Sequence, residues 1–328
     1  MILSPSSPAL IGAPDPRGKP LARRTLLQAA LAGLAAPIPA FAQDLSQAAP
    51  LFLELVDPYT EETRARGPRR AAPFTARFRH LGRRLDFVAA RHDVAPEGET
   101  FRAIRAAFTR LEPRVVILEG FPTAWGYSPQ RMRDLLAAAE AGGPLDSYLR
   151  GEPGYAMRLA LSGGVRFIGG EPASHDVDQG LYAMGYARED IAGVKMLQWL
   201  PQGRVAGEFD AAADPRLADY LDRAAARVAA DFQPQIPYSR AAYEAWHERQ
   251  FGRSVHADPE LFQRLDPSRA GRAAEISRAM TLLRDRHLYA LIIATLVPAA
   301  RTLVVYGSAH YITLRRALEA VLGRPRYV

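Results

Sequence analysis

The sequence predicts an α/β fold: a central, mostly parallel sheet flanked by helices, with an N-terminal hairpin and a helical insertion. Segments at 87–90, 114–120 and 301–308 each contain a continuous apolar run, which is typical of strands that are buried on both faces of a parallel sheet. Segments with helical spacing separate these runs. Residues 74–92 alternate apolar and polar positions on both sides of Gly82, as a hairpin does.

Each further element follows from its local pattern. The segment 99–111 has apolar residues three and four positions apart, which predicts an amphipathic helix. With the strands before and after it, this helix makes a right-handed parallel crossover unit. Pro298 and Gly323 are expected to end the last two helices. We predict strands at 51–57 and 165–170, helices at 128–141, 153–162, 271–297 and 311–323, and a helical insertion over about 176–265 that contains helices at 214–232 and 238–251.

The first 42 residues have the layout of a cleaved export signal. Paired Arg23 and Arg24 precede an apolar stretch at 26–36, and small residues surround Phe41. The arginine pair indicates the twin-arginine route, with an ordinary secretory signal as the alternative. The apolar stretch is too short for a spanning helix. We therefore expect a periplasmic or secreted protein that has no membrane span after cleavage, and a single α/β domain at 43–328.

Composition excludes several classes of function. The chain has 328 residues and no cysteine, so thiol nucleophiles and thiolate metal ligands are absent. Its net charge is +7, and the predicted signal carries four basic residues against one acidic residue, which leaves +4 for the rest. The basic residues are scattered among acidic ones and form no basic block interleaved with aromatics. Nucleic-acid binding is therefore not expected.

Ionisable side chains follow the predicted central strands. His92, Glu119, Glu171 and His310 each lie at or just after the carboxyl end of one strand, and His175 comes four residues after Glu171. In an open parallel sheet, ligands bind outside the carboxyl ends of the strands. We therefore expect these side chains to meet in one crevice. Glu171 and His175 are candidate cofactor-binding residues, although Pro172 could instead simply begin a helix.

Two kinds of chemistry suit such a cluster. His92, Glu119 and His310 could ligate a divalent metal such as Zn, Mn, Co or Fe, which would lower the pKa of a bound water. Alternatively, a histidine could act as general base on water, with a glutamate orienting it and an arginine stabilising the developing negative charge. The residue types alone leave both interpretations open.

Three stretches of the chain together resemble the TraB/PrgY/TIKI family. They are FVAARHDVAPEGETFRAIRAAFTRLEPRVVILEGF, LLRDRHLYALIIATL and LVVYGSAHYITLRRALEAVLG. The family pattern is Gly-x-x-His after the first strand, Glu closing the next, Arg on a late helix, and a second Gly-x-x-His. His92, Glu119, Arg284 and His310 occupy these positions. The second motif matches in full, whereas Ala89 stands where the family has glycine in the first.

The resemblance implies an exported hydrolase in which these four residues are catalytic. TIKI-like members imply a metal-dependent peptidase with a Mn- or Co-type site, and related branches of the wider superfamily imply an esterase or a ChaN-like haem-binding protein. The alternative functions are therefore a periplasmic haem- or metal-binding protein without turnover, or an inactive scaffold. The substrate, a peptide or a small molecule, and the oligomeric state are left open.

Overall fold

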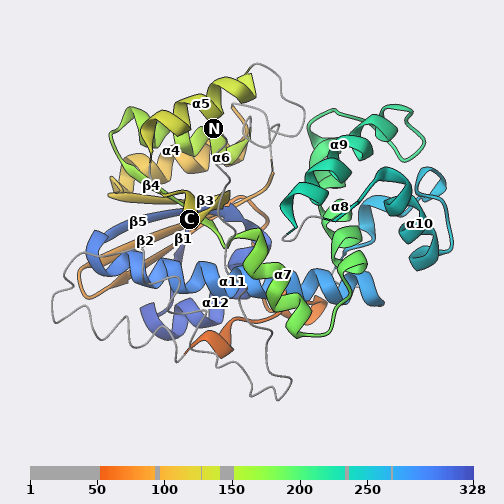
Figure 1. Cartoon of the computed structure of the whole chain (residues 1–328). Helices are drawn as coiled ribbons and strands as arrows, with labels where there is room; N and C mark the ends of the chain where they lie inside the picture. Colours follow the sequence, from red (N-terminus) through yellow and green to blue (C-terminus); the bar gives the residue numbers. More distant parts are fainter. Residues whose placement is uncertain (1–51, 93–96, 127, 141–150, 233–235, 267–268) are drawn as a thin grey trace, which may run out of the picture. The chain divides into compact units, whose positions relative to one another are not determined.

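The fold is built on one six-stranded sheet (Figure 1). The structure is a computed structural model, and it describes residues 52–92, 97–126, 128–140, 151–232, 236–266 and 269–328. The strand order is β4-β3-β5-β2-β1-β6, and the predicted fold class is confirmed. The strands are β1 (Phe74–His80), β2 (Arg83–Ala90), β3 (Val115–Pro122), β4 (Arg166–Glu171), β5 (Arg301–Gly307) and β6 (Arg326–Tyr327).

Four adjacent strands of this sheet are parallel. β5 pairs in parallel with β2 on one side and with β3 on the other, and β3 pairs in parallel with β4. The hairpin partner β1 and the short β6 add antiparallel strands at one edge. Consequently the carboxyl ends of β4, β3, β5 and β2 lie in this order along one edge of the sheet.

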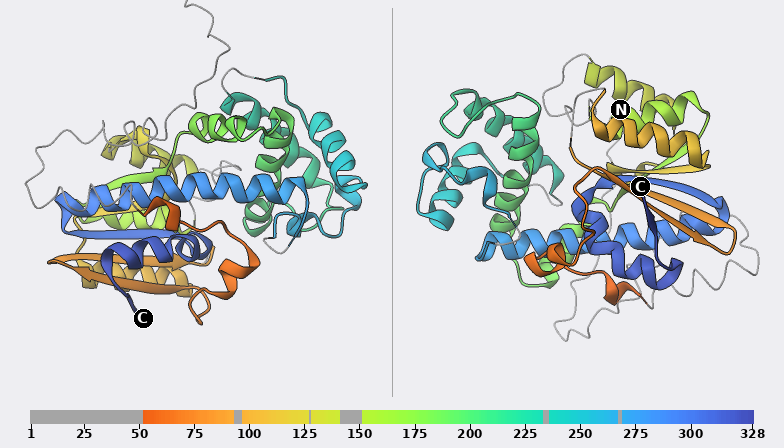
Figure 2. Two further views of the ribbon diagram at one scale, coloured as in Figure 1. Left: turned by 90° about the horizontal axis from the view of Figure 1, so that it is seen from below. Right: turned by 180° about the vertical axis from the view of Figure 1, so that it is seen from behind.

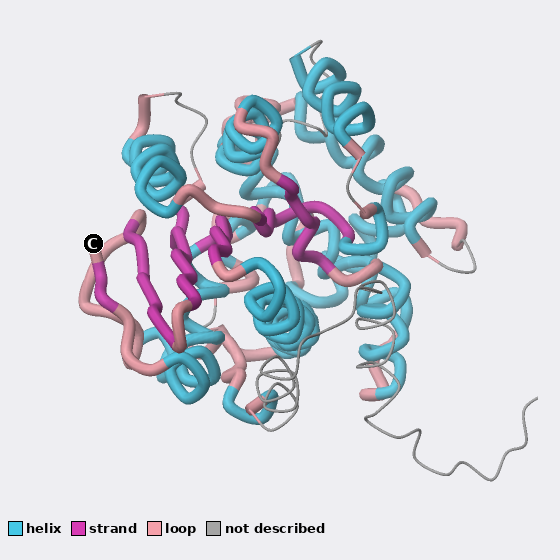
Figure 3. The backbone as a smooth tube through the Cα atoms, turned by 90° about the vertical axis from the view of Figure 1, so that its left-hand side faces the viewer, coloured by secondary structure: helices cyan, strands magenta, loops and turns pink. Residues whose placement is uncertain are grey.

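Helices cover both faces of the sheet (Figures 2 and 3). Alternate strand residues face opposite sides, so Val304 packs in one hydrophobic core and Val305 in the other. The first core includes residues of α11 and α12, and the second includes residues of α4, α5 and α6. These helices are α4 (Glu99–Leu111), α5 (Pro129–Glu140), α6 (Glu152–Ser162), α11 (Arg272–Ala299) and α12 (Ser308–Leu322).

The expected helical insertion has a hydrophobic core of its own. It consists of α7 (Ser174–Ala183), α8 (Arg188–Val205), α9 (Arg216–Asp231) and α10 (Arg240–Phe251). The first half of α11 packs in this core through Ile276 and Met280, and its second half packs against the sheet. Arg284 lies where α11 passes from one core to the other.

Several sequence predictions need correction in detail. Residues 51–57 do not form a strand: the described part has a short 3-10 helix, η2 (Leu53–Leu55), whose neighbour Asp57 donates its N–H to the Thr313 carbonyl. The long helix α11 includes Pro298 in its last turn instead of ending before it. β5 lies between the two strands of the expected crossover unit. The closing helix begins at Ser308, so His310 lies inside its first turn.

The remaining elements are short. They are α3 (Glu61–Ala65), η3 (Thr123–Trp125), η5 (Val255–Ala257) and η6 (Leu261–Gln263). In the part of the chain that the structure describes, no helix combines the length and apolar character needed to cross a membrane. The predicted export signal at 1–42 lies outside the described residues.

Candidate functional site

The carboxyl edge of the sheet brings together four of the residues predicted from the sequence. Glu171 ends β4, Glu119 lies near the end of β3, His310 follows β5 and His92 follows β2. A register shift in β3 between Leu118 and Pro122 interrupts the regular pairing at Glu119. Such irregularities re-aim side chains next to functional sites.

Glu119 is the centre of this group. Its Oε2 atom accepts a hydrogen bond from the Gly307 N–H at 2.7 Å, at the N-terminus of α12. Its Oε1 atom lies 3.4 Å from His310 Nε2 and 3.8 Å from an Arg284 nitrogen. Burial alone would raise the pKa of Glu119, but His310, His92 and Arg284 outweigh burial and hold this pKa far below its usual value. Glu119 is therefore a fixed negative charge.

Gly307 lies next to two of these side chains. A Cβ atom at this position would lie 3.4 Å from Glu119 Oε2 and 3.6 Å from His92 Nε2. These two distances place the glutamate oxygen and the imidazole nitrogen within about 7 Å of each other. The end of β5 thus lies close to both the histidine and the carboxylate, which face the same region of the site.

His310 is held by a buried aspartate, Asp285, that is not among the residues predicted from the sequence. Its Nδ1 atom lies 2.5 Å from Asp285 Oδ1, and the Thr313 hydroxyl donates to the other Asp285 oxygen at 2.6 Å. Burial opposes a charge on His310, but Asp285 and Glu119 outweigh burial and raise the pKa of His310 to about 10. His310 is therefore an imidazolium at neutral pH, hydrogen-bonded to Asp285 through Nδ1 and ion-paired with Glu119 through Nε2.

His92 is paired in the same way with Glu152, which is also not among the residues predicted from the sequence. Its Nδ1 atom lies 2.5 Å from Glu152 Oε1, and this hydrogen bond is the main reason why the pKa of His92 rises to about 9. Glu152 is buried, whereas 51% of the His92 side chain is exposed. The bond to Glu152 occupies Nδ1 and leaves Nε2 for other partners.

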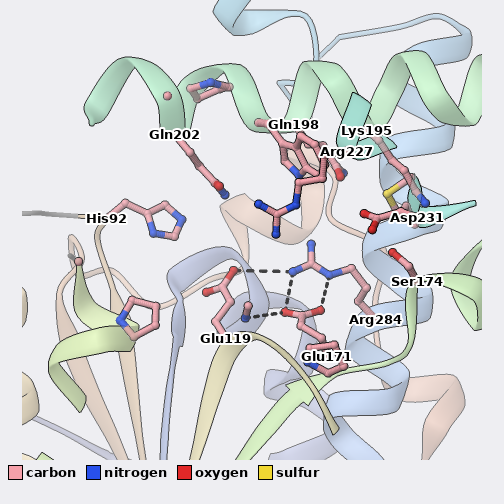
Figure 4. A pocket seen from close by; sticks show the side chains of 18 of the residues that line it. His92, Glu119, Glu171, Ser174, Lys195, Gln198, Gln202, Arg227, Asp231 and Arg284 are labelled. Carbon is pink, nitrogen blue, oxygen red and sulfur yellow. Dashed lines mark hydrogen bonds and ion pairs between the residues drawn. The ribbon is translucent and has the colours of Figure 1, made fainter. Parts of the chain in front are cut away.

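Arg284 binds the second glutamate of the edge. Its Nε and Nη2 atoms donate to the two oxygens of Glu171 at 2.7 and 2.8 Å, and the Tyr306 hydroxyl donates to Glu171 at 3.1 Å. The guanidinium keeps the pKa of Glu171 below its usual value despite burial. Figure 4 shows the third guanidinium nitrogen pointing into the pocket, away from both carboxylates.

These residues line one end of a pocket of about 670 Å³. His92, Glu119, Glu171, Arg284 and His310 form what we call the reactive wall. The opposite side, which we call the insertion wall, is formed by residues of α8 and α9 (Figure 4). It includes Lys195, Gln198, Trp199, Gln202, Arg227 and Asp231.

The structure does not bring every predicted residue to this pocket. His175 is exposed in the first turn of α7 and does not line the pocket, although Glu171 does. His287, which follows Arg284 on α11 by three residues, lies 2.8 Å from the Thr123 hydroxyl. Burial lowers its pKa, so it is neutral at pH 7.

The predicted metal ligands have only part of the geometry of a metal site. A carboxylate holds Nδ1 of both His92 and His310, which is the outer-shell pattern of metal-binding histidines. However, Glu119 is already neutralised by two protein cations, His310 and Arg284. Among the described residues, no three His, Asp or Glu side chains are placed to hold a metal ion. The side chains in this arrangement do not fit a ready-made metal centre, and a metal stays a prediction from the sequence.

Comparison with known proteins adds no family assignment. No protein-family model, curated protein or solved structure matches this chain. The resemblance to the TraB/PrgY/TIKI family therefore rests on the sequence motifs alone.

Proposed function

We propose that this protein is a hydrolase that cleaves an ester or amide bond, with His92 as general base. The observation that carries the proposal is the meeting of two histidine–carboxylate pairs, Glu119 and Arg284 at one end of a pocket large enough for a small-molecule or peptide substrate. Groups of this kind with perturbed pKa values in a cleft are typical of active sites.

In this mechanism Glu152 fixes the ring of His92. In the neutral imidazole, Nδ1–H donates to Glu152, so the lone pair of Nε2 is directed away from this bond and accepts a proton from water. The hydroxide oxygen forms a bond to the carbonyl carbon of the substrate. When the tetrahedral intermediate breaks down, the bond to the leaving group cleaves, and His92 returns the proton to the leaving oxygen or nitrogen.

The other residues of the reactive wall stabilise charge. The nitrogen of Arg284 that points into the pocket donates to the oxyanion that forms on the carbonyl oxygen. Glu171 fixes the guanidinium through two hydrogen bonds, which lowers the reorganisation needed during the reaction. Asp285 holds His310 in place, and the positively charged His310 keeps Glu119 ionised. Glu119 therefore stays negatively charged throughout the reaction.

The activity of variants tests this proposal. We expect the wild-type protein to hydrolyse some members of a panel of 4-nitrophenyl esters and 4-nitroanilides. His92→Gln should lower kcat/KM by about 10²–10⁴-fold, which is the usual contribution of a general base. His256→Gln is the matched control, because His256 lies in η5 away from the pocket. Wild-type activity in His92→Gln, or no hydrolysis across the panel, would contradict the proposal.

A chelator separates this mechanism from the metal-dependent one that the family resemblance implies. The protein-only mechanism predicts that dialysis against EDTA leaves kcat/KM unchanged. Loss of activity that Mn²⁺ or Co²⁺ restores would instead assign His92, Glu119 and His310 as metal ligands. The haem alternative predicts a Soret band after haem titration. The charged side chains on both walls of the pocket favour a polar ligand over haem.

A further inference from the structure

The insertion wall carries polar side chains for which the proposed hydrolysis has no use. α8 presents Lys195, Gln198 and Gln202 to the pocket, and Asp231 at the end of α9 lies beside Lys195 (Figure 4). The side-chain amides of Gln198 and Gln202 make no hydrogen bond to any described residue. They are therefore available to a ligand in the pocket.

Asp231 occupies an unfavourable position for a carboxylate. It is the last residue of α9, where the helix dipole is negative. It is partly buried, and burial raises its pKa more than Lys195 and Arg227 together lower it. No hydrogen bond or ion pair joins its carboxylate to the part of the chain that the structure describes. The two nearby cations thus only partly offset the cost of burying this charge, and no described residue binds the carboxylate directly.

The nearest lysine is already bound to another carboxylate. Lys195 Nζ lies 2.7 and 2.8 Å from the two oxygens of Asp178, and 4.5 Å from the centre of the Phe232 ring. Both members of this pair are buried. Since Asp178 neutralises Lys195 at short range, Asp231 keeps an accepting carboxylate that faces the pocket.

A group that satisfies Asp231 must donate hydrogen bonds and carry positive charge. An ionised carboxylate only accepts hydrogen bonds, and bonds to a charged donor are about twice as strong as bonds to a neutral one. We propose that Asp231 binds a primary ammonium group of the ligand, while Gln198 and Gln202 bind neighbouring polar groups. This inference deepens the proposed function, because it assigns a chemical class to the substrate of the same pocket.

Binding of simple probes tests the inference directly. We expect n-hexylammonium to bind the wild-type protein at least tenfold more tightly than hexan-1-ol in calorimetric titration at pH 7. Asp231→Asn should weaken hexylammonium binding about tenfold. Asp219→Asn removes the same charge from an exposed position on the same helix and should bind like wild type. Equal affinity for amine and alcohol, or unchanged binding in Asp231→Asn, would overturn the inference.

Stability gives a readout that does not depend on any ligand. Because the Asp231 carboxylate is desolvated, unbonded and at a helix C-terminus, Asp231→Asn should raise the melting temperature. Asp219 lies in the first turn of α9, where a negative charge is favourable, so Asp219→Asn should not raise it. A clear drop in melting temperature for Asp231→Asn would mean that the carboxylate is structural, and would contradict the inference.

The same variants separate this inference from the proposed hydrolysis. If hydrolysis is absent but hexylammonium binds through Asp231, the proposed function fails and the ammonium site stands. If the protein is active, the ratio of kcat/KM for 4-nitrophenyl 6-aminohexanoate to that for 4-nitrophenyl heptanoate should fall in Asp231→Asn. The affinities of trialanine, N-acetyltrialanine and hexylammonium show which source of the ammonium group binds better. A peptide N-terminus is the better source if trialanine binds more tightly than both of the others, and a small amine is the better source if hexylammonium does.

Discussion

At the scale of single residues, each histidine of the site depends on a carboxylate that the sequence did not reveal. Glu152 is 60 residues away from His92 and lies in the first turn of α6, where an acidic residue is ordinary. Asp285 is adjacent to Arg284, and neighbouring helical positions face different directions. Arg284 therefore reaches the sheet edge while Asp285 reaches α12. Residue order could predict the histidines at strand ends but not these partners.

The raised pKa of His310 predicts how stability changes with pH. The folded protein holds this proton up to about pH 10, whereas the unfolded chain releases it near pH 6.5. The stabilisation is therefore complete below about pH 6.5 and is lost as the pH rises toward 10, with a slope of up to about 1.4 kcal/mol per pH unit.

Urea unfolding between pH 6 and 10 measures this slope. His310→Gln should have a flatter profile than wild type, because its side chain does not titrate. If the two profiles run parallel over this range, His310 does not bind its proton more tightly in the folded protein.

At the scale of elements, the hydrophobic pattern correctly predicted the strands that are buried on both faces of the sheet. It wrongly predicted a strand at 51–57, where the apolar run packs outside the sheet. β2, β3 and β5 each contain a continuous run of buried apolar residues between two layers of helices, so these strands could be predicted. The run at 51–57 has similar composition, but the outer edge of β1 pairs with β6. In the structure this run packs against α12 instead. The local sequence of 51–57 does not show that another segment, β6, pairs with the edge of β1.

The insertion wall depends on close packing between α8 and α10. A Cβ atom at Gly193 would lie 2.3 Å from the ring of Trp246, so Gly193→Ala should lower the free energy of unfolding by about 1–3 kcal/mol. Gly180→Ala is the matched control in α7. Its nearest neighbour is a methyl group of Leu283 at 2.7 Å, which can move, and alanine favours the helix.

Chemical denaturation of both variants measures the difference. We expect Gly193→Ala to be clearly less stable than Gly180→Ala. Equal stability of the two variants would mean that α8 and α10 are not packed as the structure describes.

At the scale of the whole molecule, the site is assembled from segments that are distant in sequence. The strand ends could be predicted to share one edge, because parallel strands place their carboxyl ends together. The sequence could not predict that α8 and α9 form the opposite side of the pocket. These helices belong to the insertion, and they are held near the sheet edge by packing against the first half of α11. His175 illustrates the limit: it follows a strand end closely, yet the first turn of α7 leaves it exposed.

The pH dependence of kcat/KM for an ester substrate tests the central claim, that neutral His92 is the general base, most directly. The profile reports the ionisation of the free enzyme, and the pKa of His92 is about 9. We predict that kcat/KM rises about tenfold per pH unit from pH 6 to 8 and levels off above about pH 9, because only the neutral imidazole accepts a proton from water. Glu152→Gln should move the midpoint to lower pH, since it removes the main cause of the raised pKa. A profile that is flat or falls with increasing pH would contradict the assignment of His92 as the base.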